Sequence, residues 1–265
     1  MSGYKDLFGT SLTKAVDPDE IEAWLKKHPE VKTKRSRISY ILNGASLDTI
    51  SANQISEIGS VHVGEATEAN KCVDNVVNEF ADMKNSLEPA EKLIVEALHL
   101  IEGGTKGKGL RGFLGSFKAQ RDPSEIREEV KDKISDAVNQ FDVKIPIRVE
   151  PFIEGLNDAK YYLVKISEGL DNTINALNFL IDGLEDPLLK DLALRRKEMF
   201  AKSIQLMGIN MGQLDSMLKI CEQKKGFVEE LKMTVIPIIE SVMRSSLISG
   251  NTDLSQISEA LKKIL

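Results

Sequence analysis

The spacing of apolar residues constrains the fold of this chain more than any other feature of its sequence. Between Ser46 and Ser246, aliphatic residues and phenylalanines recur mainly at steps of three and four. Residues at these steps lie on one face of an α-helix, so the pattern predicts long amphipathic helices. We find no strand–turn–strand pattern in the sequence. We therefore expect an all-α protein in which long antiparallel helices form an elongated helical bundle.

Composition narrows the class of protein further. Of the 265 residues, 42% are hydrophobic and only 5% are aromatic, which is typical of packed helices. A chain of this length can bury a sizeable core. The net charge of −6 differs from the basic balance that is usual in nucleic-acid-binding proteins. We therefore expect no nucleic-acid partner.

The sequence carries no signal for secretion or for membrane insertion. Its first residues, MSGYKDLFGT, lack the apolar core of a signal peptide, and the longest apolar run is Val235–Ile239. A membrane-spanning helix needs about 20 apolar residues. The two cysteines, Cys72 and Cys221, cannot form a disulfide framework. We expect a cytoplasmic protein, with a peripheral membrane contact allowed by the basic segment described below.

Helix-start signals and breaks predict three parts. Residues 1–45 are expected to form an N-terminal arm with one short helix. Residues 46–246 are expected to form the long-helix bundle, interrupted by a glycine-rich connector at 103–122. Residues 247–265 are expected to form a C-terminal amphipathic helix, because apolar residues recur along one face of it.

Proline and glycine predict where the helices begin and end. Asp17-Pro18 and Asp122-Pro123 combine a capping acid with proline at the first helical position, so each predicts a helix start. Pro89 is expected to open a helix that ends at Gly103-Gly104. Breaks are also expected near Gly59 or Gly64, and at Pro146 and Pro151.

The longest uninterrupted helical pattern runs from Leu188 to about Met233. A helix of that length needs partners along its length, and the segment Val149–Gly183 is expected to pack against it as an antiparallel hairpin. Gly208 and Gly212 form a GxxxG pattern within the long helix. We interpret this pattern as the site of a close helix–helix crossing.

The glycine-rich stretch Gly103–Phe117, GGTKGKGLRGFLGSF, contains a GxGxxG motif. A dinucleotide-binding motif of this kind must follow a strand and open a helix. The residues before the motif have helical spacing instead, so we expect no nucleotide cofactor and interpret the stretch as a connector between helices.

The same stretch combines basic and apolar residues without any acid, which suits contact with an anionic membrane surface. The alternative is a flexible joint with no partner. The candidate contact residues are Lys106, Lys108, Arg111, Phe113, Phe117 and Lys118.

No arrangement of residues predicts catalysis or metal binding. His28, His62 and His99 are scattered, and zinc-ligand spacing is absent from the sequence. Neither a GxSxG nor an HExxH motif occurs. We therefore expect a non-enzymatic protein with no metal, no cofactor and no catalytic residues.

Three segments of the chain resemble the toxic anion resistance family, the TelA-like proteins associated with tellurite resistance. They are GFLGSFKAQRD with the helical stretch after it, GLDNTINALNFLIDGL, and the long segment that begins ALRRKEMFAKSIQLMGINMGQLD. The stretch ISEIGSVHVGEATEANKCVDNV is similar to the upstream helix of the family, with Gly59 as its internal glycine. The resemblance covers roughly Ser46 to Ser246, in layout and short motifs.

The resemblance implies an all-helical cytoplasmic protein tied to oxyanion or envelope stress that acts by binding a protein partner, itself or a membrane surface. The arm before Ser46 and the tail after Gly250 depart from the family, as does the proline-containing VKIPIRVEP segment. Two other classes stay open: a helical component of a pore-forming toxin, and a helical scaffold or assembly subunit. A pore-forming component would need an apolar tongue; Gly103–Phe117 is the only candidate, and its apolar content is too small.

Overall fold

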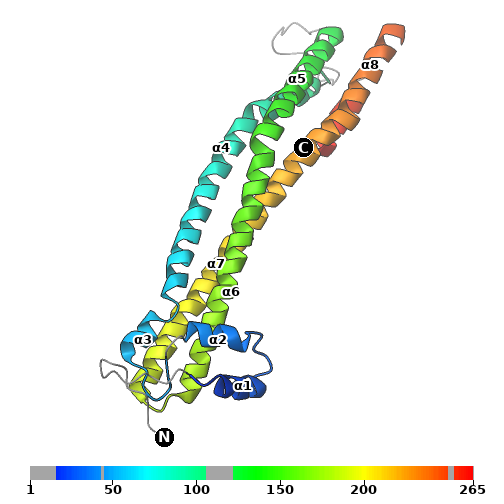
Figure 1. The fold of residues 1–265 in the computed structure, drawn as a ribbon. Helices are drawn as coiled ribbons and strands as arrows, with labels where there is room; N and C mark the ends of the chain where they lie inside the picture. The colour runs from blue at the N-terminus through cyan, green and yellow to red at the C-terminus, as the bar shows by residue number, and fades with distance from the viewer. Residues whose placement is uncertain (1–15, 43–44, 106–121, 250–253, 265) are drawn as a thin grey trace, which may run out of the picture. The chain divides into compact units, whose positions relative to one another are not determined.

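The computed structural model describes residues 16–42, 45–105, 122–249 and 254–264. Within these ranges the regular secondary structure is entirely helical, and the long helices pack against one another (Figure 1). The predicted all-α helical bundle is therefore confirmed.

The chain is divided into two compact units. One consists of Met1–Asn75 with Asn157–Leu214, and the other of Val76–Leu156 with Asp215–Leu265. The boundaries between the units fall inside three long helices, whereas the sequence placed divisions at residues 45/46 and 246/247. Each unit is described by itself below, as the first and the second unit.

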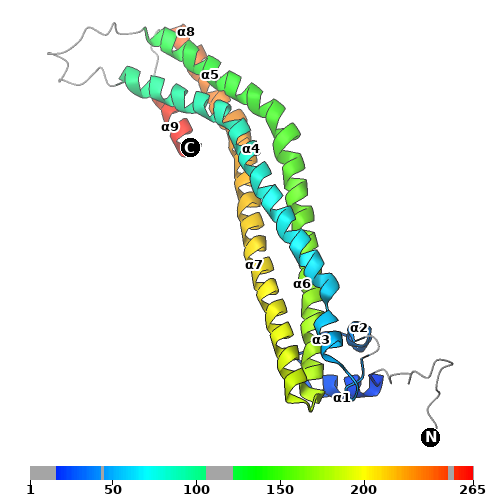
Figure 2. The same ribbon diagram turned by 90° about the vertical axis from the view of Figure 1, so that its left-hand side faces the viewer.

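Three short helices and parts of three long helices build the first unit. The short helices are α1 (Pro18–Lys27), α2 (Arg35–Ile41) and α3 (Ala52–Glu57). The unit also holds the start of α4 (Ser60–Thr105), the end of α6 (Glu150–Gly183) and the start of α7 (Pro187–Glu230). In both views, α1, α2 and α3 lie around the end of the hairpin formed by α6 and α7 (Figures 1 and 2). The predicted antiparallel hairpin is confirmed.

Local capping explains where several of these helices begin. The Asp17 carboxylate accepts a hydrogen bond of 2.9 Å from the Asp19 amide and so caps α1 at the predicted position. Ser51 and Gln54 form a capping box at the start of α3, each side chain bonding the backbone of the other. Asp186 caps α7, since its carboxylate accepts from the Leu188 amide at 2.8 Å.

The core of the first unit follows a heptad pattern, in which buried positions alternate at steps of three and four as in a coiled coil. On α6 the buried positions include Ala159, Leu163, Ile166, Leu170, Thr173, Leu177 and Leu180. On α7 they include Ala193, Phe200, Met207 and Leu214, each seven residues after the last. The buried Asn210 donates a hydrogen bond of 2.8 Å to Asn70 on α4, which favours one register between these helices.

Gly59 makes the break between α3 and α4. Its φ of +72° lies in the left-handed region, which glycine adopts without steric cost. Gly64 lies inside α4, so the break expected near one of the two glycines occurs only at the first.

The second unit contains the remainder of α4, α6 and α7 and five further helical elements. These are α5 (Pro123–Lys144), α8 (Ile236–Ser249) and α9 (Ser255–Ile264), together with two π-helical turns, η2 (Ile145–Val149) and η3 (Leu231–Val235). Asp122 caps α5 through the Ser124 amide at 2.9 Å, as predicted. The predicted C-terminal amphipathic helix is α9, which contacts α8 and η3.

Prolines interrupt this unit less than the sequence predicts. Pro89 was expected to open a helix, but it lies inside α4, which continues through Gly103 to Thr105. Its lack of an N–H removes the donor for the Asn85 carbonyl, and both residues are exposed, so water can replace that donor. Burial of Leu87, Ala90 and Ile94 on one face keeps the helix continuous across the proline.

The expected break at Pro146 and Pro151 is also wrong, because the chain passes through them in the π-helical turn η2 and the start of α6. A π-helical turn adds one residue to a helix. The spacing of the buried residues shows this extra residue. Phe141, Ile145 and Val149 are separated by four residues each, and after Val149 the spacing again alternates between three and four. The wider turn therefore returns the apolar face to the core.

Candidate functional site

Two cavities of the first unit lie beside α2 and share one set of walls. The smaller cavity has a volume of about 280 Å³ and the larger one about 500 Å³. Arg37, Tyr40 and Ile41 of α2 and His62 and Glu65 of α4 line both of them. We name these two cavities together the α2 site.

Polar contacts hold the segment before α2 against α6. The buried Thr33 hydroxyl donates to the Asn172 side-chain oxygen at 2.8 Å and accepts from the Asn175 amide at 2.9 Å. At the start of α2, the Arg35 guanidinium donates to Glu22 of α1 at 2.9 Å. These contacts position a helix of seven residues that has only Ile38 fully buried within it.

His62 occupies the boundary between the two cavities. Its Nδ1 lies 2.8 Å from a carboxylate oxygen of Glu65, which faces it one turn later on α4. In the neutral ring this contact places the proton on Nδ1, because a carboxylate only accepts. The ring packs directly on Gly169 of α6, where a Cβ atom would stand 2.9 Å from the imidazole Cε1. A larger residue at 169 therefore has to displace the imidazole.

Large side chains around the α2 site are exposed although the core of the unit is well buried. Tyr40 and Val61 are each 73% exposed, and Tyr162 is 41% exposed. Tyr40 and Val61 line the larger cavity together with apolar residues of α2 and of the loop before α4, while Tyr162 lines the smaller one.

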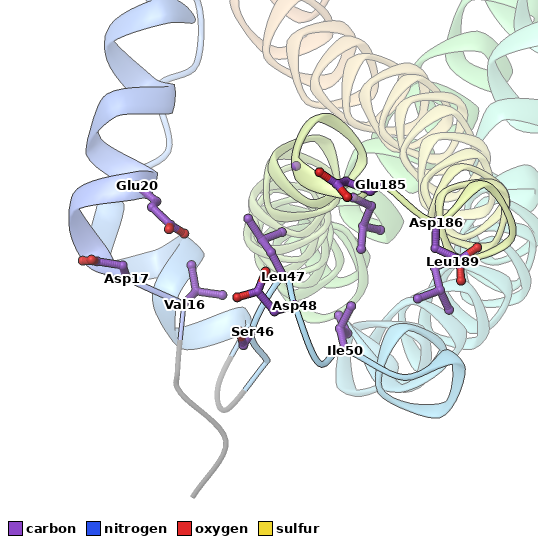
Figure 3. Close-up of a pocket in the computed structure, with 12 residues that line it drawn as sticks. Val16, Asp17, Glu20, Ser46, Leu47, Asp48, Ile50, Glu185, Asp186 and Leu189 are labelled. Carbon is purple, nitrogen blue, oxygen red and sulfur yellow. The ribbon is translucent and has the colours of Figure 1, made fainter. Parts of the chain in front are cut away.

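A third cavity of the first unit, of about 430 Å³, is lined by carboxylates (Figure 3). Asp17 and Glu20 belong to α1, Asp48 to the segment after α2, and Glu185 and Asp186 to the turn between α6 and α7. Two of these acids cap helices, as described above. All five are exposed to water, which screens their mutual repulsion. We find no group of three potential metal ligands with suitable geometry in the described ranges.

The six residues predicted to contact an anionic surface, Lys106 to Lys118, lie outside the described residues. Their contact with an anionic surface therefore stays a prediction. The described helices include none that is long and apolar enough to span a membrane.

The GxxxG prediction is wrong. In the described part of the chain, no neighbouring atom lies within 4 Å of the point where a Cβ atom would stand at Gly208 or Gly212. Both glycines are exposed on α7, because the buried seven-residue repeat of Met207 and Leu214 turns them away from the core.

The two cysteines are free and differ in burial. Cys221 is fully buried on α7, and burial raises the pKa of its thiol to about 11, with a smaller contribution from the neighbouring Glu222. A thiol in this state is unreactive at neutral pH, because the thiolate is the nucleophile. Cys72 is partly exposed on α4.

Comparisons of the chain with models of known protein families, with characterised proteins and with solved structures gave no match. The α2 site was missed in the sequence, where His62 was interpreted as one of three scattered histidines. The basic run from Lys32 to Arg37 lies within the predicted N-terminal arm and does not by itself identify a site.

Proposed function

We propose that this protein is a non-enzymatic resistance factor of the TelA-like type, which acts in the cytoplasm by binding a protein partner. The observation that carries the proposal is the exposure of Tyr40 and Val61 at the larger cavity of the α2 site. Aromatic side chains are enriched where proteins bind one another, and exposed apolar side chains that gather at a hollow are typical of such surfaces.

The shape of the larger cavity supports a contact with a side chain of the partner. Ile41, Leu42 and Ile58 line it together with the two exposed residues, and its volume of about 500 Å³ accommodates a large apolar side chain. At many protein–protein interfaces, a few side chains of one protein fill pockets of the other and contribute most of the binding energy.

The association with toxic anions is supported by the resemblance in layout between Ser46 and Ser246, and growth tests it directly. We expect a strain that lacks the gene to grow poorly on tellurite and to recover when the parent protein is restored. The variant with Tyr40→Ser and Val61→Ser should fail to restore growth, because it removes both exposed side chains from the cavity.

Leu188→Ser is the matched control. Leu188 is 80% exposed on α7 in the same unit and lines neither cavity of the α2 site, so this variant should restore growth fully. Circular dichroism must show that all variants keep their helices. If deletion of the gene leaves tellurite tolerance unchanged, the TelA-like function is refuted and a scaffold role is favoured. If the double variant restores growth, only the assignment of the contact surface is refuted.

A further inference from the structure

Several side chains that can donate hydrogen bonds line the smaller cavity of the α2 site without a partner among the described residues. Arg37 of α2 and Lys165 of α6 line it, and neither forms an ion pair or hydrogen bond with any described residue. Lys165 only lies over the ring of Tyr161, at 5.3 Å from its centroid. The hydroxyl groups of Tyr40 and Tyr162 likewise find no partner in the described part of the chain.

Asn172 adds a further donor, and its orientation follows from the contacts of Thr33. Thr33 accepts from Asn175 and therefore donates to the Asn172 side-chain oxygen, at 2.8 Å. The Asn172 NH₂ group is left at the cavity with no acceptor among the described residues.

Two carboxylates line the same cavity. One oxygen of Glu65 accepts from His62 at 2.8 Å. Glu168 has no partner among the described residues. Five side chains that can donate thus share the cavity with two carboxylates, so a ligand that is rich in acceptor oxygens complements it.

We propose that the smaller cavity of the α2 site binds a tetrahedral oxyanion of the phosphate type, either free or carried by a small organic group. The guanidinium of Arg37 can donate two parallel hydrogen bonds to such an anion, and Lys165 supplies a second positive charge. The tyrosine hydroxyls and the Asn172 amide donate to its remaining oxygens. The volume of about 280 Å³ lies just below the usual range for ligand pockets, which fits a small molecule.

Glu65 and Glu168 both oppose the anion, and Glu168, which has no partner among the described residues, sets the direction of one test. Its charge lowers the affinity of the cavity for any oxyanion, and neutralising it without changing its shape should raise that affinity. This inference goes beyond the proposed function and does not rest on it, since Lys165 and Glu168, which its test changes, line the smaller cavity and not the larger one.

Titration calorimetry of the full chain at constant ionic strength tests the proposal, with inorganic phosphate and phenyl phosphate as separate probes. We expect saturable binding that falls about tenfold or more in Arg37→Gln and in Lys165→Gln, because each removes a charge-assisted hydrogen bond. Glu168→Gln should bind more tightly than the parent. Lys202→Gln changes the same charge at an exposed position of α7 outside the cavity, and it should bind as the parent does.

The two probes separate the sources of the oxyanion. Binding of both identifies the anion itself as the ligand, and binding of phenyl phosphate alone identifies a phosphate ester whose organic group contacts the tyrosines. Binding of neither probe overturns the proposal. Equal affinity in the parent, Arg37→Gln and Lys165→Gln overturns it as well, and if Arg37→Gln fails to fold, Lys165→Gln and Glu168→Gln decide.

Discussion

Replacing Gly59 with alanine should destabilise the first unit strongly. The backbone of Gly59 has a φ of +72°, in the left-handed region. A residue with a Cβ atom costs roughly 1–2 kcal/mol in that conformation. The added Cβ would also stand 2.6 Å from Cγ2 of Thr173 and 2.7 Å from Cζ of Phe200, far closer than atoms in contact.

Neither neighbour can move aside easily. Thr173 and Phe200 are fully buried, and the Thr173 hydroxyl donates to the Gly169 carbonyl at 2.9 Å. Arg196 lies over the ring of Phe200 at 5.0 Å and donates to the Ile58 carbonyl at 3.0 Å, next to the glycine. Overpacking of a well-packed core costs about 1–3 kcal/mol. Together with the backbone term, Gly59→Ala should cost about 2–5 kcal/mol.

Thermal and urea unfolding, followed by circular dichroism, measure this loss. For a domain of this size, 2–5 kcal/mol lowers the melting temperature by about 4–20 °C. Gly64→Ala is the matched control, because Gly64 lies within α4 with no neighbouring atom within 4 Å of its Cβ position. Alanine is favoured over glycine there by about 1 kcal/mol, so this variant should be slightly more stable. If Gly59→Ala melts with the parent, the turn and its packing are not as described.

The remaining predictions concern the long helix α7 and the basic segment. Leu214→Asp buries a carboxylate at a fully buried position and should cost several kcal/mol, so an unchanged melting temperature would show that the helix register is wrong. The pKa of about 11 for buried Cys221 lies above that of a free thiol, so the neutral thiol stabilises the fold and stability should fall as the pH rises from about 9 to about 11. Urea unfolding across that range should show a smaller loss in Cys221→Ala, and an equal loss would contradict the assignment. Liposome co-sedimentation should show weak, salt-sensitive binding of the parent protein to anionic lipid, and this binding should be lost when Lys106, Lys108 and Arg111 are all changed to Glu. If the parent protein does not bind anionic liposomes at low salt, the membrane contact is refuted and the segment is only a connector between helices.

The sequence predicted those parts of the fold whose signals are local or periodic. The spacing of apolar residues predicted α6, α7 and their antiparallel hairpin, because one helix face must be buried along the whole length. The capping acids Asp17 and Asp122 predicted two helix starts, since the capping hydrogen bond forms within two residues of the chain.

Prolines misled the prediction because local propensity was overridden by burial. Pro89 and Pro146 both lie within continuous helical backbone, where apolar contacts on either side outweigh the lost hydrogen bond. The π-helical turn was detectable in principle: two successive steps of four between Phe141, Ile145 and Val149 break the alternation of three and four.

The α2 site could not be predicted from sequence patterns. The helix α2 has seven residues, too few for a periodic signal, and its site joins Arg37, His62 and Tyr162 from three separate segments. The contact between Thr33 and Asn172 spans 139 residues of sequence. Only tertiary packing brings such residues together, and none of them belongs to a recognised motif.

Site-specific photocrosslinking in living cells tests the central claim, that the surface around α2 binds a protein partner. A photoreactive phenylalanine analogue would replace Tyr40 in one variant and Leu188, on α7, in the other. We predict a discrete protein adduct from position 40, weakened by Val61→Asp in the same cavity, and none from position 188. Adducts of equal yield at both positions, or no adduct at position 40, would contradict the account.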